Sequence, residues 1–322
     1  MHTRCYRDGR LVDEGFPIAA VSDHLENPAN TVWFDLCSPT PEELDSVREE
    51  LGLHSLAIED AQNPGQRPKL DHYPSHLFLV AYAAVVDESG RLGAHEVSVF
   101  ITEHALVTVR ADEGFDIDEV MRRWDDSISL AGDGVAYLLH GLLDYVVDTH
   151  YTAVQRMDTE VDDLEDQLFD EQPVRDTQMQ RRTFGLRKDL VALRRIVLPM
   201  REVVNSLLRR DLGIVPQSLT PYFQDVYDHV LRVSEWTDSL RDLLANILET
   251  RLTLRGNQLN VVMKQVTSWA AIIAVPTAVT GFYGQNVPYP GHDSWAGFIV
   301  STVVIVGASL TLYLLFRRRG WI

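Results

Sequence analysis

The hydrophobic pattern is strongest near the C-terminal end of the chain. Residues 265–283 are nineteen consecutive positions without a charged side chain, and residues 295–316 are twenty-two. At ~1.5 Å of helical rise per residue, each stretch is long enough to cross ~30 Å of hydrocarbon. We therefore predict two transmembrane helices, joined by a short extracytoplasmic loop at residues 284–294. Two buried helices of a soluble core are the weaker alternative, because such helices seldom stay uncharged over this length.

The charges beside these stretches predict their orientation. The loop contains neither Lys nor Arg, whereas basic residues precede the first stretch and follow the second: Arg251, Arg255, Lys264, Arg317, Arg318 and Arg319. Cytoplasmic flanks carry the excess of Lys and Arg, so both termini should be cytoplasmic, with a basic tail at residues 317–322. The start of the chain lacks the apolar core of a secretory signal. We expect a multi-pass protein of the cell (cytoplasmic) membrane.

Residues 1–132 combine strand-like and helix-like patterns. A helix is expected at residues 41–53, and short β-branched and aromatic runs predict strands at residues 32–36, 77–82, 97–101 and 106–110. This mixture predicts a cytoplasmic α/β domain. The chain contains no glycine-rich phosphate loop, nucleophile elbow or zinc-protease motif, so we expect no enzymatic activity.

Residues 133–215 predict an antiparallel hairpin of two long helices with opposite charge. Ten acidic residues and one basic residue lie between positions 144 and 171, and Pro173 is expected to end this first helix. The second helix, at residues 175–210, has ten basic residues and three acidic ones. Apolar seams follow three-four spacing at Val154, Met157, Val161, Leu164 and Leu168, and at Leu186, Leu190, Leu193, Val197, Met200, Val204 and Leu207. The preferred interpretation is that the two charged faces pair; the alternative is that the acidic helix collects divalent ions.

Residues 216–264 predict a stalk helix that continues into the first membrane segment. No proline lies between Pro221 and Pro276, so one helix of about 63 residues, ~95 Å long, is expected. Its apolar seam comprises Val226, Val230, Val233, Leu240, Leu244 and Ile247. Acidic side chains recur every seven residues, at Asp228, Glu235, Asp242 and Glu249, and would share one face of a supercoiled bundle. That face either surrounds the axis of an assembly or is a solvated exterior, and the pattern leaves both open.

Net charge narrows the range of partners. The 322-residue chain has 29 Lys plus Arg against 47 Asp plus Glu, a formal net charge of -18. Proteins that bind nucleic acid concentrate basic residues, so we expect no nucleic-acid partner and favour cations. The two cysteines, Cys5 and Cys37, lack the spacing of a disulfide framework or a thiolate metal site.

The loop motif carries the most specific signal. Residues 281–288, Gly-Phe-Tyr-Gly-Gln-Asn-Val-Pro, resemble the Tyr-Gly-Met-Asn hallmark that follows the first of two C-terminal spans in the CorA family of divalent-cation (magnesium and cobalt) transporters. Further segments match the family in the same order, at residues 53–60, 66–70, 221–229 and 260–264. The chain departs from the hallmark at Gln285, which replaces methionine. This Gly-X-Asn variant leaves the transported ion open among Mg²⁺, Co²⁺, Ni²⁺ and Zn²⁺.

The resemblance implies an α+β membrane protein that assembles as a homopentameric funnel. Cytoplasmic α/β domains would form its wide end, the long stalk helices would line a central pore, and the second spans would lie outside them in the lipid bilayer. Two spans of one chain cannot enclose a pore, which independently calls for a closed assembly. The implied selectivity filter is Gly284, Gln285 and Asn286. Five Asn286 amide oxygens would bind the water shell of Mg²⁺ without removing it, whereas in an arbitrary loop Asn286 would merely stabilise a turn.

The resemblance also implies pore-lining and regulatory positions. The implied pore-lining residues include an apolar constriction, polar rings and an acidic ring: Met263 and Val266; Asn260 and Thr277; and Glu249. A regulatory metal site is implied at Asp225, with its partner in the Asp87 and Glu88 turn. Mg²⁺ is thus expected as both the transported and the regulatory ion, and no organic cofactor is expected.

These observations predict passive Mg²⁺ influx, with Co²⁺ or Ni²⁺ as further substrates, driven by the membrane potential and gated by intracellular Mg²⁺. A divalent ion gains ~4.6 kcal/mol per 100 mV on moving inward, so no ATP-binding motif is needed. One alternative is a ZntB-like zinc transporter, which competition between Mg²⁺ and Zn²⁺ would distinguish. The other is a membrane-anchored metal-sensing scaffold, which would be monomeric or dimeric in mild detergent.

Overall fold

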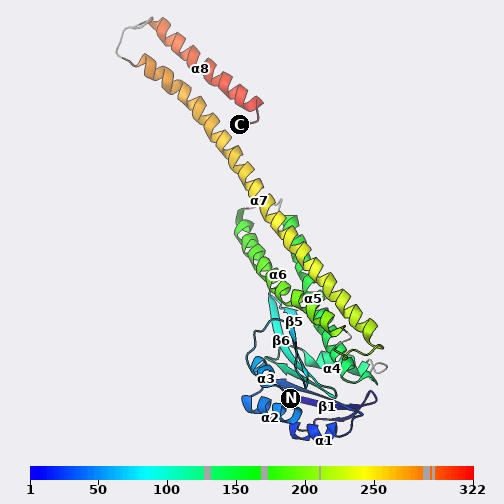
Figure 1. Cartoon of the computed structure of the whole chain (residues 1–322). Helices are drawn as coiled ribbons and strands as arrows, with labels where there is room; N and C mark the ends of the chain where they lie inside the picture. Colours follow the sequence, from blue (N-terminus) through cyan, green and yellow to red (C-terminus); the bar gives the residue numbers. More distant parts are fainter. Residues whose placement is uncertain (127–131, 168–172, 210–211, 286–290, 292–293) are drawn as a thin grey trace. The chain divides into compact units, whose positions relative to one another are not determined.

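The strand-rich first third of the chain folds into one mixed sheet (Figure 1). The sheet has seven strands in the order β2-β1-β3-β7-β6-β5-β4. β3 and β7 are parallel, and every other neighbouring pair is antiparallel. The strands are β1 (His2–Arg7), β2 (Arg10–Glu14), β3 (Asn30–Cys37), β4 (Lys69–His72), β5 (Leu77–Val86), β6 (Leu92–Ile101) and β7 (Ala105–Arg110).

The computed structural model describes residues 1–126, 132–167, 173–209, 212–285, 291 and 294–322. The chain divides into two units, residues 1–245 and residues 246–322. The first unit holds the sheet, the helices that pack on it and the start of the long helix α7 (Thr220–Tyr283). The second holds the apolar part of α7 and the helix α8 (Trp295–Arg318). The finer division of the chain into seven segments remains a prediction.

The four strands predicted from the sequence are confirmed as β3, β5, β6 and β7. Side chains on both faces of these strands are buried, and Trp33, Phe34, Phe78 and Phe100 are fully inaccessible. The apolar runs in the sequence therefore correspond to strands whose side chains are buried in the sheet. The pattern does not predict β1, β2 and β4, because they lie toward the edges of the sheet and mix charged with apolar residues. All five residues of β2 are exposed.

The helix predicted at residues 41–53 is α2 (Pro41–Leu51). It begins with a capping box, in which the Thr40 hydroxyl accepts from the Glu43 backbone N–H and the Glu43 carboxylate accepts from the Thr40 N–H. It ends two residues earlier than predicted because Gly52 adopts the left-handed conformation, with φ of 61°. The other short helices of this unit are α1 (Val21–Leu25), α3 (Ser55–Gln62) and α4 (Ile117–Asp126).

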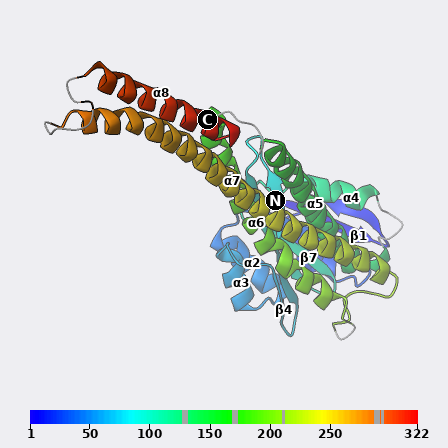
Figure 2. The same ribbon diagram turned by 90° about the horizontal axis from the view of Figure 1, so that it is seen from above.

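The predicted helical hairpin is α5 (Val135–Asp166) and α6 (Pro173–Leu207), which lie side by side (Figures 1 and 2). The apolar seams of both helices are buried, apart from Leu168, which lies outside the described residues. The prediction that Pro173 ends the first helix is wrong: α5 ends at Asp166, and Pro173 begins α6. Proline suits the first turn of a helix because its missing N–H would have no intrahelical partner there.

The long helix α7 is confirmed as one element of 64 residues. In the first unit its apolar seam is buried, from Val226 at 1% exposure to Leu244 at 1%. In the second unit α7 and α8 are the two helices, among the described residues, that are long and apolar enough to cross a membrane. Their surfaces are almost entirely exposed in the single chain, which is the pattern of helices that meet lipid or other subunits instead of a soluble core.

Candidate ion pathway and metal-binding residues

One side of α7 in the second unit carries the residues implied to line a pore. At 100° per residue, Glu249, Asn260, Met263, Val266 and Thr277 fall within roughly a third of the helix circumference. All five are exposed, and Met263 and Val266 keep 62% and 59% of their surface accessible. Polar, acidic and apolar side chains therefore share one uncovered face of α7, which runs from Glu249 into the uncharged stretch at residues 265–283.

The opposite side of α7 is the side that is partly covered. Ser268 is fully buried, and Ile272, Val275 and Val279 are half-buried, all within an arc roughly opposite the face just described. α8 lies along the C-terminal part of α7 (Figure 1). The ring centroids of Trp269 on α7 and Tyr313 on α8 are 6.5 Å apart. The chain's own second span therefore leaves the candidate pore face free.

The Thr277 hydroxyl donates a hydrogen bond within α7, and its oxygen can still accept one. It donates to the Ile273 carbonyl at 3.1 Å, so the hydroxyl oxygen keeps its lone pairs available to a water molecule. Pro276 lacks the N–H that would pair with a carbonyl one turn earlier. One turn later, the Thr280 hydroxyl lies within donating distance of the Pro276 and Thr277 carbonyls, at 2.8 and 3.2 Å.

The first part of the loop motif, Gly284 and Gln285, directly follows the last residue of α7. Gly284 donates its backbone N–H to the Thr280 carbonyl at 2.8 Å, and a Cβ on Gly284 would lie 3.0 Å from that oxygen. Glycine thus permits the close turn that closes the helix. Gln285 is exposed just beyond it. Asn286, the implied filter residue, lies outside the described residues, so its role remains a prediction.

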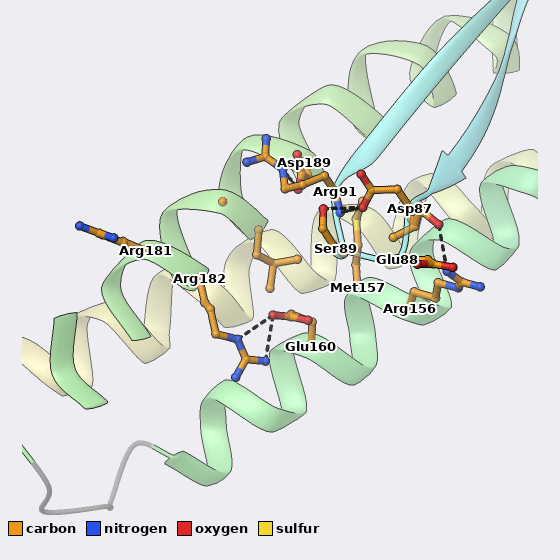
Figure 3. A pocket seen from close by; sticks show the side chains of 14 residues that line it. Asp87, Glu88, Ser89, Arg91, Arg156, Met157, Glu160, Arg181, Arg182 and Asp189 are labelled. Atoms are coloured by element: carbon orange, nitrogen blue, oxygen red, sulfur yellow. Dashed lines mark hydrogen bonds and ion pairs between the residues drawn. The ribbon is translucent and has the colours of Figure 1, made fainter. Parts of the chain in front are cut away.

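The Asp87 and Glu88 turn joins β5 to β6 and borders a pocket of about 490 Å³ against α5 and α6 (Figure 3). Asp87 accepts from the Arg91 backbone N–H at 2.8 Å and from the Ser89 hydroxyl at 2.7 Å. The Arg91 N–H, followed by the Ser89 hydroxyl, lowers the pKa of Asp87 and keeps it negative. Glu88 is exposed and has no ion-pair partner within the described part of the chain.

Arginine side chains hold this turn against the helical hairpin. Arg156 of α5 donates to the Val86 carbonyl at 2.9 Å, and Arg91 pairs with Asp189 of α6 at 3.1 Å. Asp189 is 3% exposed, and its burial raises its pKa. These contacts were not predicted. Their one sequence signal is that Asp189 is among the few acidic residues of a basic helix.

The acidic face of α5 is largely engaged by basic or donor groups. Arg123 pairs with Asp144 at 2.9 Å and with Asp148 at 2.7 Å. Farther along α5, ion pairs and a hydrogen bond join Glu160 and Asp163 to Arg182, and Asp158 to the Trp236 indole. No cluster of three or more metal-ligating side chains occurs among the described residues. The predicted pairing between the two hairpin helices is thus seen at Arg182 of α6, whereas Asp144 and Asp148 pair with Arg123 of α4.

Asp225 lies at the other end of α5 from the Asp87 and Glu88 turn. It is exposed in the second turn of α7, where its carboxylate is 4.0 Å from His229. The neighbouring Tyr222 ring lies 5.8 Å from the ring of His140 on α5. His140 and Arg156, which mark the two locations, are sixteen residues apart on one helix, or ~24 Å. A single chain therefore does not bring Asp225 and the turn together.

Comparisons with known proteins identify the family. The model of the CorA-like Mg²⁺ transporter protein family matches residues 28–318. The chain belongs to the CorA family. It is 30% identical to the cobalt/magnesium transport protein CorA of Thermotoga maritima over 279 residues, 86% of this chain and 79% of that protein. The expected resemblance is thus confirmed, and the protein is a divalent-cation transporter of this family.

Other CorA-family relatives extend the likeness to the whole chain. The solved CorA magnesium transporter of Methanocaldococcus jannaschii superimposes with a TM-score of 0.79 at 22% identity, covering 99% of this chain and 98% of that one. This confirms the predicted fold of an N-terminal α/β domain, a long helix and two C-terminal apolar helices. The zinc transport protein ZntB of Yersinia pseudotuberculosis is 21% identical over 97% of this chain and 94% of its own length.

Proposed function

We propose that this chain assembles as a homopentamer around a central pore and conducts Mg²⁺ into the cell, down the membrane potential. The observation that supports this best is the uncovered face of α7, which carries Glu249, Asn260, Met263, Val266 and Thr277 opposite the side that faces α8. Within the apolar span, the Thr277 hydroxyl is a polar group that would be costly to expose to lipid. Five such faces turned toward one axis would line a passage with it.

Selectivity is proposed to reside in the loop after α7. Asn286 would present a ring of amide oxygens to an ion that keeps its water shell, which suits Mg²⁺ because this ion dehydrates reluctantly. Gly284 supports the proposal because it allows the tight closure of the preceding helix. Gln285 would border this filter, where the family hallmark has methionine.

The other implied pore-lining residues would set how the ion is conducted and how the pore closes. The Thr277 and Asn260 side chains would hydrogen-bond the hydration shell, while Met263 and Val266 would form an apolar constriction that closes by excluding water. Glu249 would attract cations at the cytoplasmic side of this constriction. A divalent ion moving inward gains ~4.6 kcal/mol per 100 mV, so membrane potential alone is a sufficient driving force.

Regulation by intracellular Mg²⁺ is proposed to use Asp225 of one subunit and the Asp87 and Glu88 turn of another. Support comes from the exposed carboxylates of Asp225 and Glu88, from the ionised state of Asp87, and from the ~24 Å that separates the two locations in one chain. Mg²⁺ bound between subunits would favour the closed assembly, and its release would shift the population toward the open one.

Flux into liposomes tests the proposed filter. Wild-type protein should admit Mg²⁺ under an inside-negative potential, and Asn286→Ala should lose at least tenfold in initial rate because the amide oxygens are gone. Gln258→Ala is the matched control: it removes an amide from an exposed position on the opposite side of α7 and should leave the rate unchanged. Equal rates for wild type and Asn286→Ala would exclude the proposed filter.

A zinc transporter is the second candidate, favoured by Gln285 in place of methionine and by the full-length similarity to ZntB. The same liposomes separate the two functions when Mg²⁺ and Zn²⁺ compete, with and without a proton gradient. Mg²⁺ conduction predicts flux without the gradient and weak competition by Zn²⁺. Flux of Zn²⁺ in preference to Mg²⁺, with dependence on the proton gradient, would support the zinc candidate instead.

A further inference from the structure

Three consecutive arginines follow the apolar part of α8, and their charges are not compensated within the chain. Arg317 and Arg318 are the last two residues of the helix, and Arg319 caps it. All three side chains are exposed. None has an ion-pair or hydrogen-bond partner among the residues that the structure describes. The C-terminal end of a helix carries about half a negative charge, so most of the triplet's positive charge remains available to another partner.

The chain turns back immediately after the triplet. Gly320 has φ of 67°, and Trp321 donates its backbone N–H to the Phe316 carbonyl at 3.0 Å. This turn lays the Trp321 ring almost parallel to the Phe316 ring, with 5.6 Å between centroids and 7° between planes. Trp321 is half-buried. An indole ring fixed in this way beside exposed arginines is typical of a residue at the boundary between hydrocarbon and headgroups.

Aromatic residues along α7 and α8 indicate the depth of the triplet. Trp295 at one end of α8 and Tyr313 near the other are eighteen residues apart, or ~27 Å, close to the thickness of a hydrocarbon core. Trp269 of α7 lies level with Tyr313. The triplet follows Tyr313 by four to six residues, ~6–9 Å, which corresponds to the headgroup layer. Lys264 precedes Trp269 by five residues and lies at a similar depth.

We propose that Arg317, Arg318 and Arg319 bind the phosphate of an anionic phospholipid in the cytoplasmic leaflet, with Trp321 packed against its glycerol and upper acyl region. The proposal rests on α7 and α8 crossing the membrane and is independent of the transported ion. Guanidinium groups match phosphate geometry in a bidentate way. Four basic residues beside a membrane helix, counting Lys264, are the pattern of a juxtamembrane segment that prefers anionic lipid.

Quenching of Trp321 fluorescence by brominated lipid measures this preference directly. The full chain carries Trp269→Phe and Trp295→Phe, so that Trp321 is the tryptophan within the membrane-spanning unit. It is reconstituted in phosphatidylcholine bilayers with increasing fractions of brominated phosphatidylglycerol or brominated phosphatidylcholine. The ratio of the two binding constants should exceed ten, because each basic residue near an anionic surface contributes about fivefold. Arg317→Gln, Arg318→Gln and Arg319→Gln together should reduce that ratio to near one.

Two control proteins separate this site from general charge and from topology. Arg181→Gln, Lys188→Gln and Arg195→Gln remove the same charge from exposed positions of α6 and should leave the ratio unchanged. Replacing Arg317, Arg318 and Arg319 by Lys keeps the charge that orients the span, and the ratio should fall only partly because bidentate contacts are lost.

Three results would overturn the proposal. The first is a ratio near one in the wild-type background, and the second is an unchanged ratio in the triple Gln variant. The third is relief of quenching when inorganic phosphate is added at constant ionic strength, because the ligand would then be a free anion and not a lipid headgroup. Since no cation flux is measured, failure here leaves the proposed transport function untouched.

Discussion

Several polar residues of the first unit are buried because they contact residues far away in the sequence. Asp35 of β3 is fully buried and pairs with Arg110 of β7 at 2.7 Å. His150 of α5 is also fully buried, with its Nε2 at 2.7 Å from the Tyr82 carbonyl, where it donates as the neutral ring. Nothing in the local sequence marks these residues as buried. Their environments arise because parallel pairing joins β3 to β7, and because α5 packs on β5.

His150 should make stability depend on pH. Burial lowers its pKa from 6.5 to about 4, so the unfolded chain binds the proton first as pH falls. The contribution of neutral His150 to the free energy of unfolding is fully present above pH 6.5. It is lost as pH falls toward 4, at about 1.4 kcal/mol per pH unit. When pH falls from 7.5 to 5, the free energy of unfolding of His150→Gln should decrease by about 2 kcal/mol less than that of wild type. Urea unfolding followed by tryptophan fluorescence measures both values. The exposed His72→Gln should behave like wild type, and an identical pH response in His150→Gln would refute this account.

At the scale of elements, the contact between α4 and α5 depends on one residue without a side chain. The Trp124 indole of α4 donates to the Leu138 carbonyl at 3.0 Å and meets the Trp33 ring edge-on, with 4.9 Å between centroids. It passes directly over Gly141, where an added Cβ would lie 2.5 Å from the indole nitrogen. Glycine is usually unfavourable inside a helix, so packing explains its presence in α5.

Gly141→Ala should therefore destabilise the first unit, residues 1–245. The methyl group would displace Trp124 from its hydrogen bond and from Trp33, at a cost of about 1–3 kcal/mol. Gly185→Ala is the matched control within α6, since its Cβ would meet only the Arg91 guanidinium at 3.9 Å. That variant should gain about 0.5–1 kcal/mol from helix propensity. Thermal unfolding of both variants measures the difference, and equal midpoints would contradict the packing argument.

At the scale of the whole molecule, the two locations proposed for metal regulation lie on different parts of one subunit. Asp225 is beside His229 and near His140, whereas the Asp87 turn is held by Arg156 and Asp189. Carboxylates this far apart cannot share an ion within one chain. The proposed regulation therefore requires contact between subunits, and it links metal binding to the arrangement of the assembly.

Asp225→Asn should weaken inhibition by Mg²⁺ on the cytoplasmic side. The amide keeps the shape of the side chain but removes the charge that would hold the ion. In liposomes, the Mg²⁺ concentration that halves the flux should rise about tenfold or more, without loss of the maximal rate. Glu50→Gln removes an exposed carboxylate from α2 and should not change this concentration. Unaltered inhibition in Asp225→Asn would remove this residue from the regulatory site.

The sequence by itself determined the features that depend on local periodicity and charge. The two apolar spans, the central strands, the paired helices and the long α7 follow from side chains whose burial repeats along one element. The loop motif and its ordered companions determined the family, which the match over residues 28–318 confirms. Pro173 was misplaced because a proline punctuates the chain without stating on which side the helix lies.

Only the tertiary structure decided which distant segments meet. It paired β3 with β7, added the polar edge strands, and placed Asp35 beside Arg110, 75 residues away. It also showed that α8 covers the side of α7 opposite the candidate pore face, and that Asp225 lies far from the Asp87 turn. The physical reason is that local periodicity predicts only which side of an element is buried. The residues that bury it belong to elements far apart in the chain, so their identity depends on tertiary packing.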